Sequence, residues 1–233
     1  MTLPVLRGRV PRRDARGHAS MTAHPPVRAV IFDYGGVLSN MRWDVSRQLE
    51  DAHGLPRGAI METLYRTPTW GEIERGRGDR AAWLAEAHRL LEARAGRPLP
   101  RLHDAWRGAH QPVADNIALA RALRPAYRTA ILSNADRSLR ERLRATGLHD
   151  LFDAIVSSAE EGMAKPEPAI YRLAAERLAV PPTACVFVDD FEPNVEAAVA
   201  VGMRGVLFYI DRGHDLRAML ADLGLTITPA DQA

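Results

Sequence analysis

Four short segments of the sequence carry side chains that can act on an electrophile or hold a metal ion. In the first, Asp33 follows the apolar run VRAVIF and precedes Gly35 and Gly36. A carboxylate can act as a nucleophile, and glycines allow a tight turn and the close approach of a ligand to the backbone. Alone, an aspartate at the end of a strand is equally typical of a residue that caps a turn. The other three segments decide between these interpretations.

Those segments supply a hydroxyl, an ammonium group and two adjacent carboxylates. Ser133 and Asn134 end an apolar run, where a hydroxyl and nearby backbone N–H groups can bind an anion. Lys165, in the loop MAKPEP, offers positive charge to a dianion. Asp189 and Asp190 follow the run CVFV, and adjacent carboxylates are stabilised when a hard cation such as Mg²⁺ lies beside them. Each segment alone has a simpler explanation, respectively a helix N-cap, a solvated lysine and a surface turn.

The predicted strands and helices explain why these segments should meet. Continuous apolar runs are typical of strands covered on both faces, and helical patterns alternate with them. This alternation predicts an α/β fold with a doubly wound, Rossmann-like parallel sheet, whose strands all end at one edge. The predicted strands are Val27–Phe32, Thr129–Ser133, Ala154–Ser157, Ala184–Val188 and Gly205–Ile210, and the helices between them are Ser138–Thr146, Pro168–Leu178 and Pro193–Val201.

A helical block interrupts this alternation. The first two predicted strands are about 95 residues apart, which is too far for a single crossover. Asp79 is a typical N-cap, and apolar residues recur at helical spacing after it. We therefore predict an α-helical cap over residues 41–115, inserted into a core formed by residues 28–40 and 116–225. The predicted cap helices are Asp44–His53, Arg57–Tyr65, Asp79–Ala95 and Pro100–Ala109.

The composition argues against several classes of protein. The 233 residues carry a formal net charge of only +2, which gives no reason to expect a nucleic-acid partner. The basic excess lies in residues 1–27, which contain four prolines and no apolar period, and which we expect to be disordered. The single cysteine, Cys185, excludes an internal disulfide, and no apolar stretch is long enough to cross a membrane. We expect a cytoplasmic monomer or homodimer without a membrane partner.

Together, the four segments resemble the motifs of the haloacid dehalogenase-like superfamily, in the subgroup whose helical cap follows the first strand. FDYGGVL resembles the first motif, LSN the second, AKPEP the third and VDDFEPN the fourth. The motifs occur in the order of the family, and the match covers about residues 28–212. The pattern is most similar to the phosphatase branch that includes bacterial α-glucose-1-phosphate phosphatase and the N-terminal domain of soluble epoxide hydrolase.

The resemblance implies a Mg²⁺-dependent phosphatase that acts on a small phosphorylated metabolite. Asp33 would attack phosphorus and form an aspartyl-phosphate, which divides one difficult displacement into two easier ones. The metal would be held by Asp33, the Gly35 carbonyl and Asp190, with Asp189 nearby, and would neutralise charge between two anions.

The resemblance also assigns the groups that bind the substrate. Lys165 would be catalytic as well as substrate-binding, because it stabilises charge in the transition state. Asn194 is expected to orient the loop of the fourth motif. The expected substrate-binding residues are Ser133, Asn134 through its backbone N–H, Lys165 and Gly36.

One position departs from the pattern of the family. Most of its phosphatases have a second aspartate two residues after the nucleophile, where it protonates the leaving group and activates water, but this chain has Gly35. Loss of a general acid–base typically lowers a rate by about 10²–10⁴-fold. Members of the resembling branch with glycine here are nonetheless phosphatases. We therefore expect a good leaving group, or a proton supplied by the substrate, water or the cap.

Two other functions stay open at this point. A 2-haloacid dehalogenase of the same fold attacks carbon without a metal, and its first motif normally has a tyrosine two residues after the nucleophile. Here Tyr34 is one residue after it, and the Asp189–Asp190 pair favours a metal. The second alternative is a catalytically weak protein that binds or senses phosphate compounds, which the glycine at position 35 motivates.

Specificity is expected to come from the cap, because cap segments of this arrangement close over the site and exclude water. The aromatic candidates have a simpler role in packing and the charged ones a simpler role at the surface. Arg42 and Arg77 are further candidates for binding a second acidic group, although no spacing supports them. The candidate specificity residues are Trp43, Trp70, Glu72, Glu74, Arg75 and His110.

Overall fold

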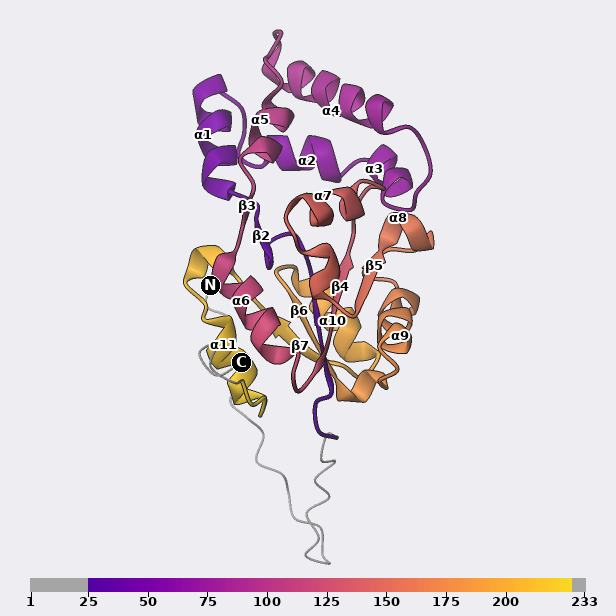
Figure 1. Ribbon diagram of the computed structural model, residues 1–233. Coiled ribbons are helices and arrows are strands. Elements are labelled where there is room, and N and C mark those ends of the chain that lie inside the picture. Colours follow the sequence, from indigo (N-terminus) through magenta and orange to yellow (C-terminus); the bar gives the residue numbers. More distant parts are fainter. Residues whose placement is uncertain (1–24, 228–233) are drawn as a thin grey trace, which may run out of the picture.

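A parallel five-stranded sheet forms the lower lobe of the molecule in Figure 1. The computed structural model describes residues 25–227. From β1 the chain adds β4 and β5 on one side and then returns to add β6 and β7 on the other, in the order β5-β4-β1-β6-β7. This doubly wound topology confirms the predicted fold class. The strands are β1 (Ala29–Phe32), β4 (Arg128–Ser133), β5 (Ala154–Ser157), β6 (Cys185–Asp189) and β7 (Arg204–Leu207).

Helices cover both faces of the sheet, which explains the continuous apolar runs. In β1, Val30 and Phe32 pack into one hydrophobic cluster and Ala29 and Ile31 into a second. Successive side chains of a strand point to opposite faces, so a strand covered on both sides is apolar at every position. The first cluster includes residues of α6 (Ala114–Leu123), α7 (Leu139–Ala145) and α11 (Leu216–Asp222), and the second those of α9 (Pro168–Arg177) and α10 (Glu192–Ala200).

Five helices form the upper lobe of Figure 1 and have a hydrophobic cluster of their own. Trp83, Leu91 and Trp106 are among its fully buried members. The chain enters this lobe after β2 (Ser39–Asn40) and leaves it through β3 (Gln111–Pro112), and these two short strands pair antiparallel. The helices are α1 (Trp43–His53), α2 (Ala59–Tyr65), α3 (Pro68–Ile73), α4 (Arg80–Ala95) and α5 (Leu102–Gly108).

Several elements differ from the sequence prediction. The expected strand Gly205–Ile210 ends at Leu207, because the chain turns into a short 3₁₀ helix at Ile210–Arg212. The helix expected from Arg57 begins at Ala59, after Gly58 adopts a positive φ of 86°. Four helices were not predicted: α3, α6, α11 and the short α8 (Ser158–Glu161). Helix α6 begins at Ala114, close to the predicted start of the second core segment.

Two further predictions concern the N-terminal tail and the absence of a membrane-spanning segment. All but the last three residues of the tail predicted at positions 1–27 lie outside the described residues. Within positions 25–227, no helix has both the length and the apolar character needed to cross a membrane.

Candidate active site

The parallel register of the sheet brings the ends of three strands to one edge. Phe32, the last residue of β1, lies beside Ile131 of β4 and Val188 of β6. The Asp33 N–H continues the ladder by donating to the Val188 carbonyl at 2.8 Å. Asp33, Ser133 and Asp189 therefore emerge together although they are distant in the sequence, as the sequence predicted for parallel strands.

Lys165 lies between two of these carboxylates. Its Nζ is 2.9 Å from Asp33 Oδ1 and 2.6 Å from Asp189 Oδ2, and the residue is only 4% exposed. Burial alone would lower the pKa of Lys165, but Asp189 and Asp33 raise it, so the ammonium group stays charged. Lys165 is also the only lysine of the 233-residue sequence. A compact ammonium group suits this narrow position better than a planar guanidinium.

Two asparagines hold this arrangement in place. The side chain of Asn134 accepts from Lys165 N at 2.8 Å and donates to Lys165 O at 2.9 Å, so it fixes the backbone of the lysine loop. Asn194 Nδ2 donates to Asp189 Oδ2 at 3.0 Å, and Phe191 N donates to Asp189 Oδ1 at 2.8 Å. The Asn194 contact agrees with its expected role in the fourth motif, whereas the side-chain role of Asn134 was not predicted.

The three acidic residues of the site have different partners. Both oxygens of Asp189 accept hydrogen bonds from protein groups, as described above. Asp33 Oδ1 is bound by Lys165 and by Tyr34 N at 2.7 Å, and Oδ2 accepts no hydrogen bond from the residues that the structure describes. Asp190 makes no side-chain hydrogen bond within the described part of the chain. The free carboxylate oxygens therefore belong to Asp33 and Asp190, whereas Asp189 holds the lysine.

These carboxylates fit a divalent cation. Asp33, Asp189 and Asp190 each offer an oxygen within 4.8 Å of the others. Burial, together with repulsion from Asp33 and Asp189, raises the pKa of Asp190 to about 8. Burial also raises the pKa of Asp33 to about 6, against the lowering effect of Lys165. One lysine does not balance three acidic groups, and oxygen ligands of this kind are those that Mg²⁺ prefers.

The glycines after the nucleophile have separate roles. Gly36 has a positive φ of 79°, and a Cβ atom on it would lie 2.0 Å from Asp190 Oδ2. Its N–H donates to Ser39 O at 2.8 Å, so a part for Gly36 in substrate binding stays a prediction. Gly35 has no such φ, and a Cβ atom there would meet only the flexible end of the Met41 side chain, with Sδ at 3.3 Å. Gly36 thus leaves room for Asp190, whereas Gly35 mainly leaves the position of the usual acid empty.

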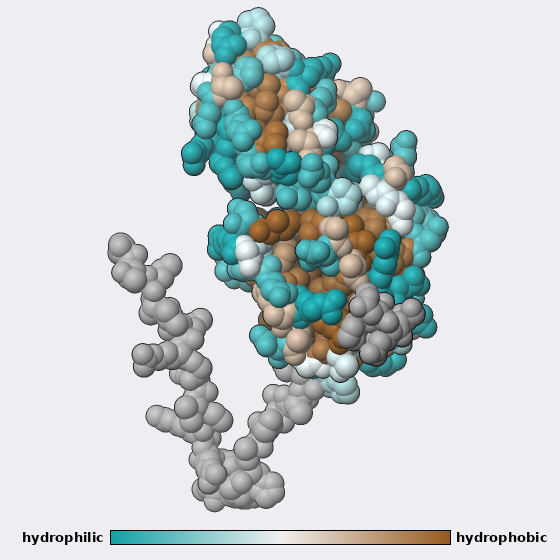
Figure 2. All heavy atoms as spheres, turned by 60° about the vertical axis from the view of Figure 1, so that its left-hand side comes forward, coloured by the Kyte–Doolittle hydropathy of each residue, from teal (hydrophilic) through white to brown (hydrophobic). Residues whose placement is uncertain are grey.

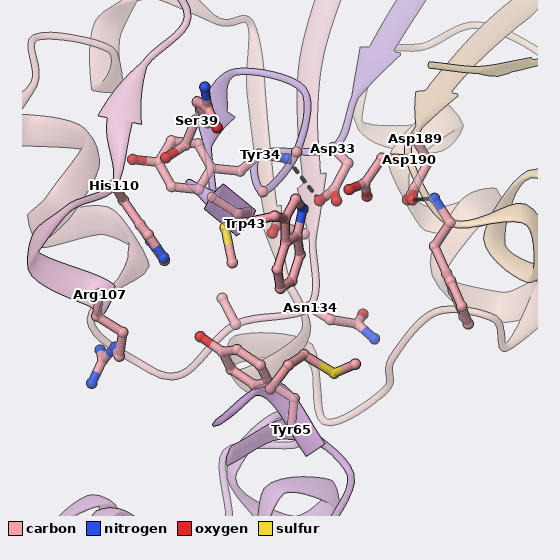
Figure 3. Close-up of a pocket in the computed structure, with 18 of the residues that line it drawn as sticks. Asp33, Tyr34, Ser39, Trp43, Tyr65, Arg107, His110, Asn134, Asp189 and Asp190 are labelled. Carbon is pink, nitrogen blue, oxygen red and sulfur yellow. Dashed lines mark hydrogen bonds between the residues drawn. The ribbon is translucent and has the colours of Figure 1, made fainter. Parts of the chain in front are cut away.

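The site opens into a cavity of about 1110 Å³ between the two lobes. Figure 2 shows the notch between the lobes from outside, and Figure 3 shows side chains that line the cavity. Every predicted site residue of the core lines it, including Ser133, Asn134 and Lys165. Four of the six predicted cap residues also line it, namely Trp43, Trp70, Glu74 and His110.

The remaining charged candidates of the cap are engaged elsewhere. Glu72 pairs with Arg77 at 2.6 Å at an exposed position, and Arg42 pairs with Asp44 at 2.7 Å. Arg77 is not among the residues that line the cavity, and Arg42 is not either. The structure therefore does not favour Arg42 or Arg77 as groups that bind a second acid.

Polar contacts join the cap to the core beside the site. Asn134 Nδ2 donates to Glu74 Oε2 at 3.1 Å, and Arg75 pairs with Glu167 at 2.5 Å. Arg80 of α4 pairs at 2.9 Å with Asp136, which follows β4. Burial would raise the pKa of Asp136, but hydrogen bonds and ion pairs from Ser138, Arg142 and Arg80 lower it. The lobes therefore contact each other next to the motif residues.

Sequence reasoning missed several residues that line the cavity. Tyr65 ends α2, Arg107 lies on α5 three positions before His110, and Asp136 follows the second motif. The chain turns directly after α5, where the His110 N–H donates to the Arg107 carbonyl at 3.3 Å, and the short spacing of these two residues is a signal that the sequence did contain. Tyr34, one residue after the nucleophile, also lines the cavity.

Known proteins provide an independent comparison. Residues 27–202 match the family described as haloacid dehalogenase-like hydrolase. A curated relative, the phosphatase MT3486 of Mycobacterium tuberculosis (strain CDC 1551 / Oshkosh), is 34% identical over 204 residues, which cover 82% of this chain and 90% of that protein.

Solved structures show the same fold. The enzyme bt-2542 of Bacteroides thetaiotaomicron, in complex with magnesium and inorganic phosphate, is 22% identical with a TM-score of 0.61, covering 83% of this chain and 98% of that one. The L-2-haloacid dehalogenase of Xanthobacter autotrophicus is 27% identical with a TM-score of 0.56, covering 87% and 85%. The fold is thus shared with an enzyme solved in complex with magnesium and phosphate and with a dehalogenase.

Proposed function

Because the chain belongs to the haloacid dehalogenase-like hydrolase family, we propose that it is a Mg²⁺-dependent phosphatase that hydrolyses a small phosphomonoester through an aspartyl-phosphate on Asp33. One observation carries the proposal: carboxylate oxygens of Asp33, Asp189 and Asp190 lie within 4.8 Å of one another beside the buried Lys165. This arrangement combines a nucleophile, a place for a cation and a fixed positive charge. The phosphatase name of the relative from Mycobacterium tuberculosis supports the same reaction.

Asp33 is the proposed nucleophile. Its Oδ1 is held by Lys165 and Tyr34 N, so Oδ2 is the oxygen that attacks phosphorus. The new P–O bond forms as the bond to the leaving oxygen breaks, and that oxygen takes a proton from solvent water, to which the water of the second step returns one. Water then attacks the phosphorus of the aspartyl-phosphate, which releases inorganic phosphate and restores the carboxylate.

Charge around the phosphate is balanced by two cations. Lys165 and Ser133 bind phosphate oxygens, and Asp189 keeps the lysine at its position. Mg²⁺, held by Asp33, Asp190 and the Gly35 carbonyl, would supply Lewis-acid stabilisation of the phosphoryl oxygens. Asn134 and Asn194 act through Lys165 and Asp189 and are positioning residues.

We propose that residues 41–115 act as the cap that encloses the substrate. The contacts of Glu74 and Arg80 with the core support this, because they hold the helical lobe beside the nucleophile. With glycine at position 35, the leaving oxygen has no carboxylic acid from the first motif. The single buried Cys185 supports a place in the reducing cytoplasm.

A phosphate-release assay tests the proposal. Purified protein with Mg²⁺ should hydrolyse p-nitrophenyl phosphate or members of a phosphomonoester panel, and chelation should stop the reaction. Asp33→Asn should remove activity, because the amide has nearly the same shape but cannot form the acyl-phosphate. Asp51→Asn, at an exposed position on α1, is the matched control and should keep wild-type activity.

Two results would contradict the proposal. One is retention of more than a few per cent of the phosphatase activity by Asp33→Asn. The other is release of chloride from 2-chloropropionate in the presence of a chelator together with no phosphate release from any ester, which would favour dehalogenation.

A further inference from the structure

The cavity contains positive charge that the proposed chemistry does not use. Arg107, on α5, lines the cavity, is partly buried and has no carboxylate partner among residues 25–227. Its guanidinium lies 5.8 Å from the centre of the Trp83 ring. An arginine that is partly buried without an acidic partner is a natural site for an external anion, because its five N–H donors match a carboxylate or phosphate.

His110 provides a second unused polar group on the same side. Its Nε2 is buried and has no hydrogen-bond partner among residues 25–227, although most buried polar atoms have one. Burial, together with the positive charges of Arg107 and Arg142, lowers the pKa of His110 to about 4, so the imidazole is neutral near pH 7. A neutral imidazole can donate one hydrogen bond to an anion without adding charge.

These groups lie away from the nucleophile. In Figure 3, Asp33, Asp189 and Asp190 are on one side of the cavity, and His110 and Arg107 are on the opposite side. Trp43 is drawn between them, and the hydroxyl of Tyr65 points toward the side of His110. The cavity thus has a phosphate end, an aromatic middle and a basic end.

The surrounding charges reinforce the basic end. Arg142 lines the cavity, and its guanidinium shares the carboxylate of Asp136 with Arg80, so two arginines face this one carboxylate. The exposed arginines Arg47, Arg66 and Arg212 line the cavity as well. Fixed positive charge in a cleft attracts anions and raises their local concentration.

We propose that Arg107 and His110, with the hydroxyl of Tyr65, bind a carboxylate or a second phosphate at the far end of the leaving group. This inference rests on the proposed function and names its substrate class: a phosphomonoester whose leaving group carries an apolar body and a distal anion. The apolar body lies against Trp43, and the distal anion reaches Arg107. Arg107 and His110 take the place of Arg42 and Arg77, which the sequence suggested as residues that bind a second acidic group.

Matched ligands test the proposal. One series consists of ω-carboxyalkyl phosphates of increasing length, and the other of n-alkyl phosphates of the same lengths. Calorimetry in the presence of Mg²⁺ uses the variant Asp33→Asn, which cannot hydrolyse the ligands. The Kd values of the two ligands of each length give the preference for the distal acid. At the matching length, we expect the acid to bind about 10- to 100-fold more tightly, as for other charge-assisted contacts.

Variants identify the group responsible. When Arg107→Gln is combined with Asp33→Asn, the ratio of the Kd of the alkyl phosphate to that of the matched acid should fall to nearly one. Arg107→Lys should keep part of this preference. Arg89→Gln, at an exposed position of α4 that does not line the cavity, is the control and should leave the preference unchanged. Thermal melting checks that each variant folds.

The outcomes separate this inference from the phosphatase proposal. If no length gives a preference, or if the preference survives Arg107→Gln, the distal site is wrong. If the wild-type protein hydrolyses both series equally well, the phosphatase proposal stands and the distal site falls. If the acids bind with a preference that Arg107→Gln removes but no ester is hydrolysed, the distal site stands and the phosphatase proposal falls. If neither series binds or reacts, both are overturned.

Discussion

Replacing Lys165 with methionine tests whether this lysine is the counter-ion of two buried carboxylates. The side chains of Lys165, Asp33 and Asp189 are 1%, 11% and 0% exposed, so water does little to screen their charges. Removing one partner of a buried ion pair typically costs about 3–5 kcal/mol, a large part of the roughly 5–15 kcal/mol that stabilises a domain. We expect Lys165→Met to lower the free energy of unfolding by about this amount near pH 8 and to abolish phosphate release.

The loss of stability should shrink as the pH falls. Lys165 lowers the pKa of Asp33, which burial has already raised to about 6, so removing the lysine raises this pKa further. A carboxyl group with a raised folded-state pKa destabilises the fold above that pKa, and the penalty vanishes below the unfolded value of about 4. Urea unfolding at pH 5 should therefore show a smaller difference between Lys165→Met and the wild type than unfolding at pH 8.

A double-mutant cycle isolates the pair itself. Asp189→Asn removes one of the two charges that Lys165→Met leaves unpaired, so the double variant should be more stable than the sum of the single losses predicts. Residues in direct contact typically give interaction energies of about 0.5–3 kcal/mol. A value indistinguishable from zero, or a loss for Lys165→Met no larger than that for the exposed control Arg89→Met, would refute the assignment of Lys165 as their counter-ion.

Three further predictions concern the cation and the glycines. Mg²⁺ should raise the melting temperature more at pH 8 than at pH 5, because the pKa values of Asp33 and Asp190, raised to about 6 and about 8, make protons compete with the cation at low pH; an equal shift at both pH values would contradict this. Gly36→Ala should lower the affinity for Mg²⁺, because the new Cβ would lie 2.0 Å from the Asp190 carboxylate, so that more Mg²⁺ is needed for half-maximal activity. Gly162→Ala, with a positive φ of 70° but no atom within 4 Å of the added Cβ, is the control that isolates backbone strain and should keep wild-type affinity for Mg²⁺ in an activity titration. Gly35→Asp should raise turnover of alkyl phosphates relative to p-nitrophenyl phosphate, because an added acid helps poor leaving groups most; an unchanged ratio in the rate assay would show that this position no longer matters.

The strands of the core were the most predictable part of the fold. A strand covered on both faces must be apolar throughout, so Val30 and Ile31 of β1 mark it although they enter different clusters. Helices α6 and α11 were missed, although α6 contributes Ile117 and Leu123 to the core. Their apolar residues become recognisable as one face only once the sheet that they cover is known.

The membership of the site could be predicted, but not the partners of each group. Parallel strands place Asp33, Asp189 and Asp190 at one edge, and this follows from topology alone. Asp189 and Asp190 are adjacent and chemically identical in the sequence. They differ because Asp189 is fully buried against Lys165 and Asn194, whereas Asp190 lies against Gly36. This difference depends on the direction in which each side chain points from the end of the strand, and the motif sequence does not specify that direction.

A simple count was the strongest signal that sequence reasoning left unused. Of 31 lysine and arginine residues in the chain, Lys165 is the only lysine. At exposed positions either lysine or arginine can serve as a solvated charge, so the bias toward arginine says little about the role of an exposed basic residue. Lys165 occupies a buried space between two carboxylates, with its Nζ 5.4 Å from the centre of the Phe187 ring. There a guanidinium is too wide, and a small ammonium group with three rotatable donors fits. In a chain that otherwise uses arginine throughout, the single lysine therefore marks a buried position where a small cation fits better than a guanidinium.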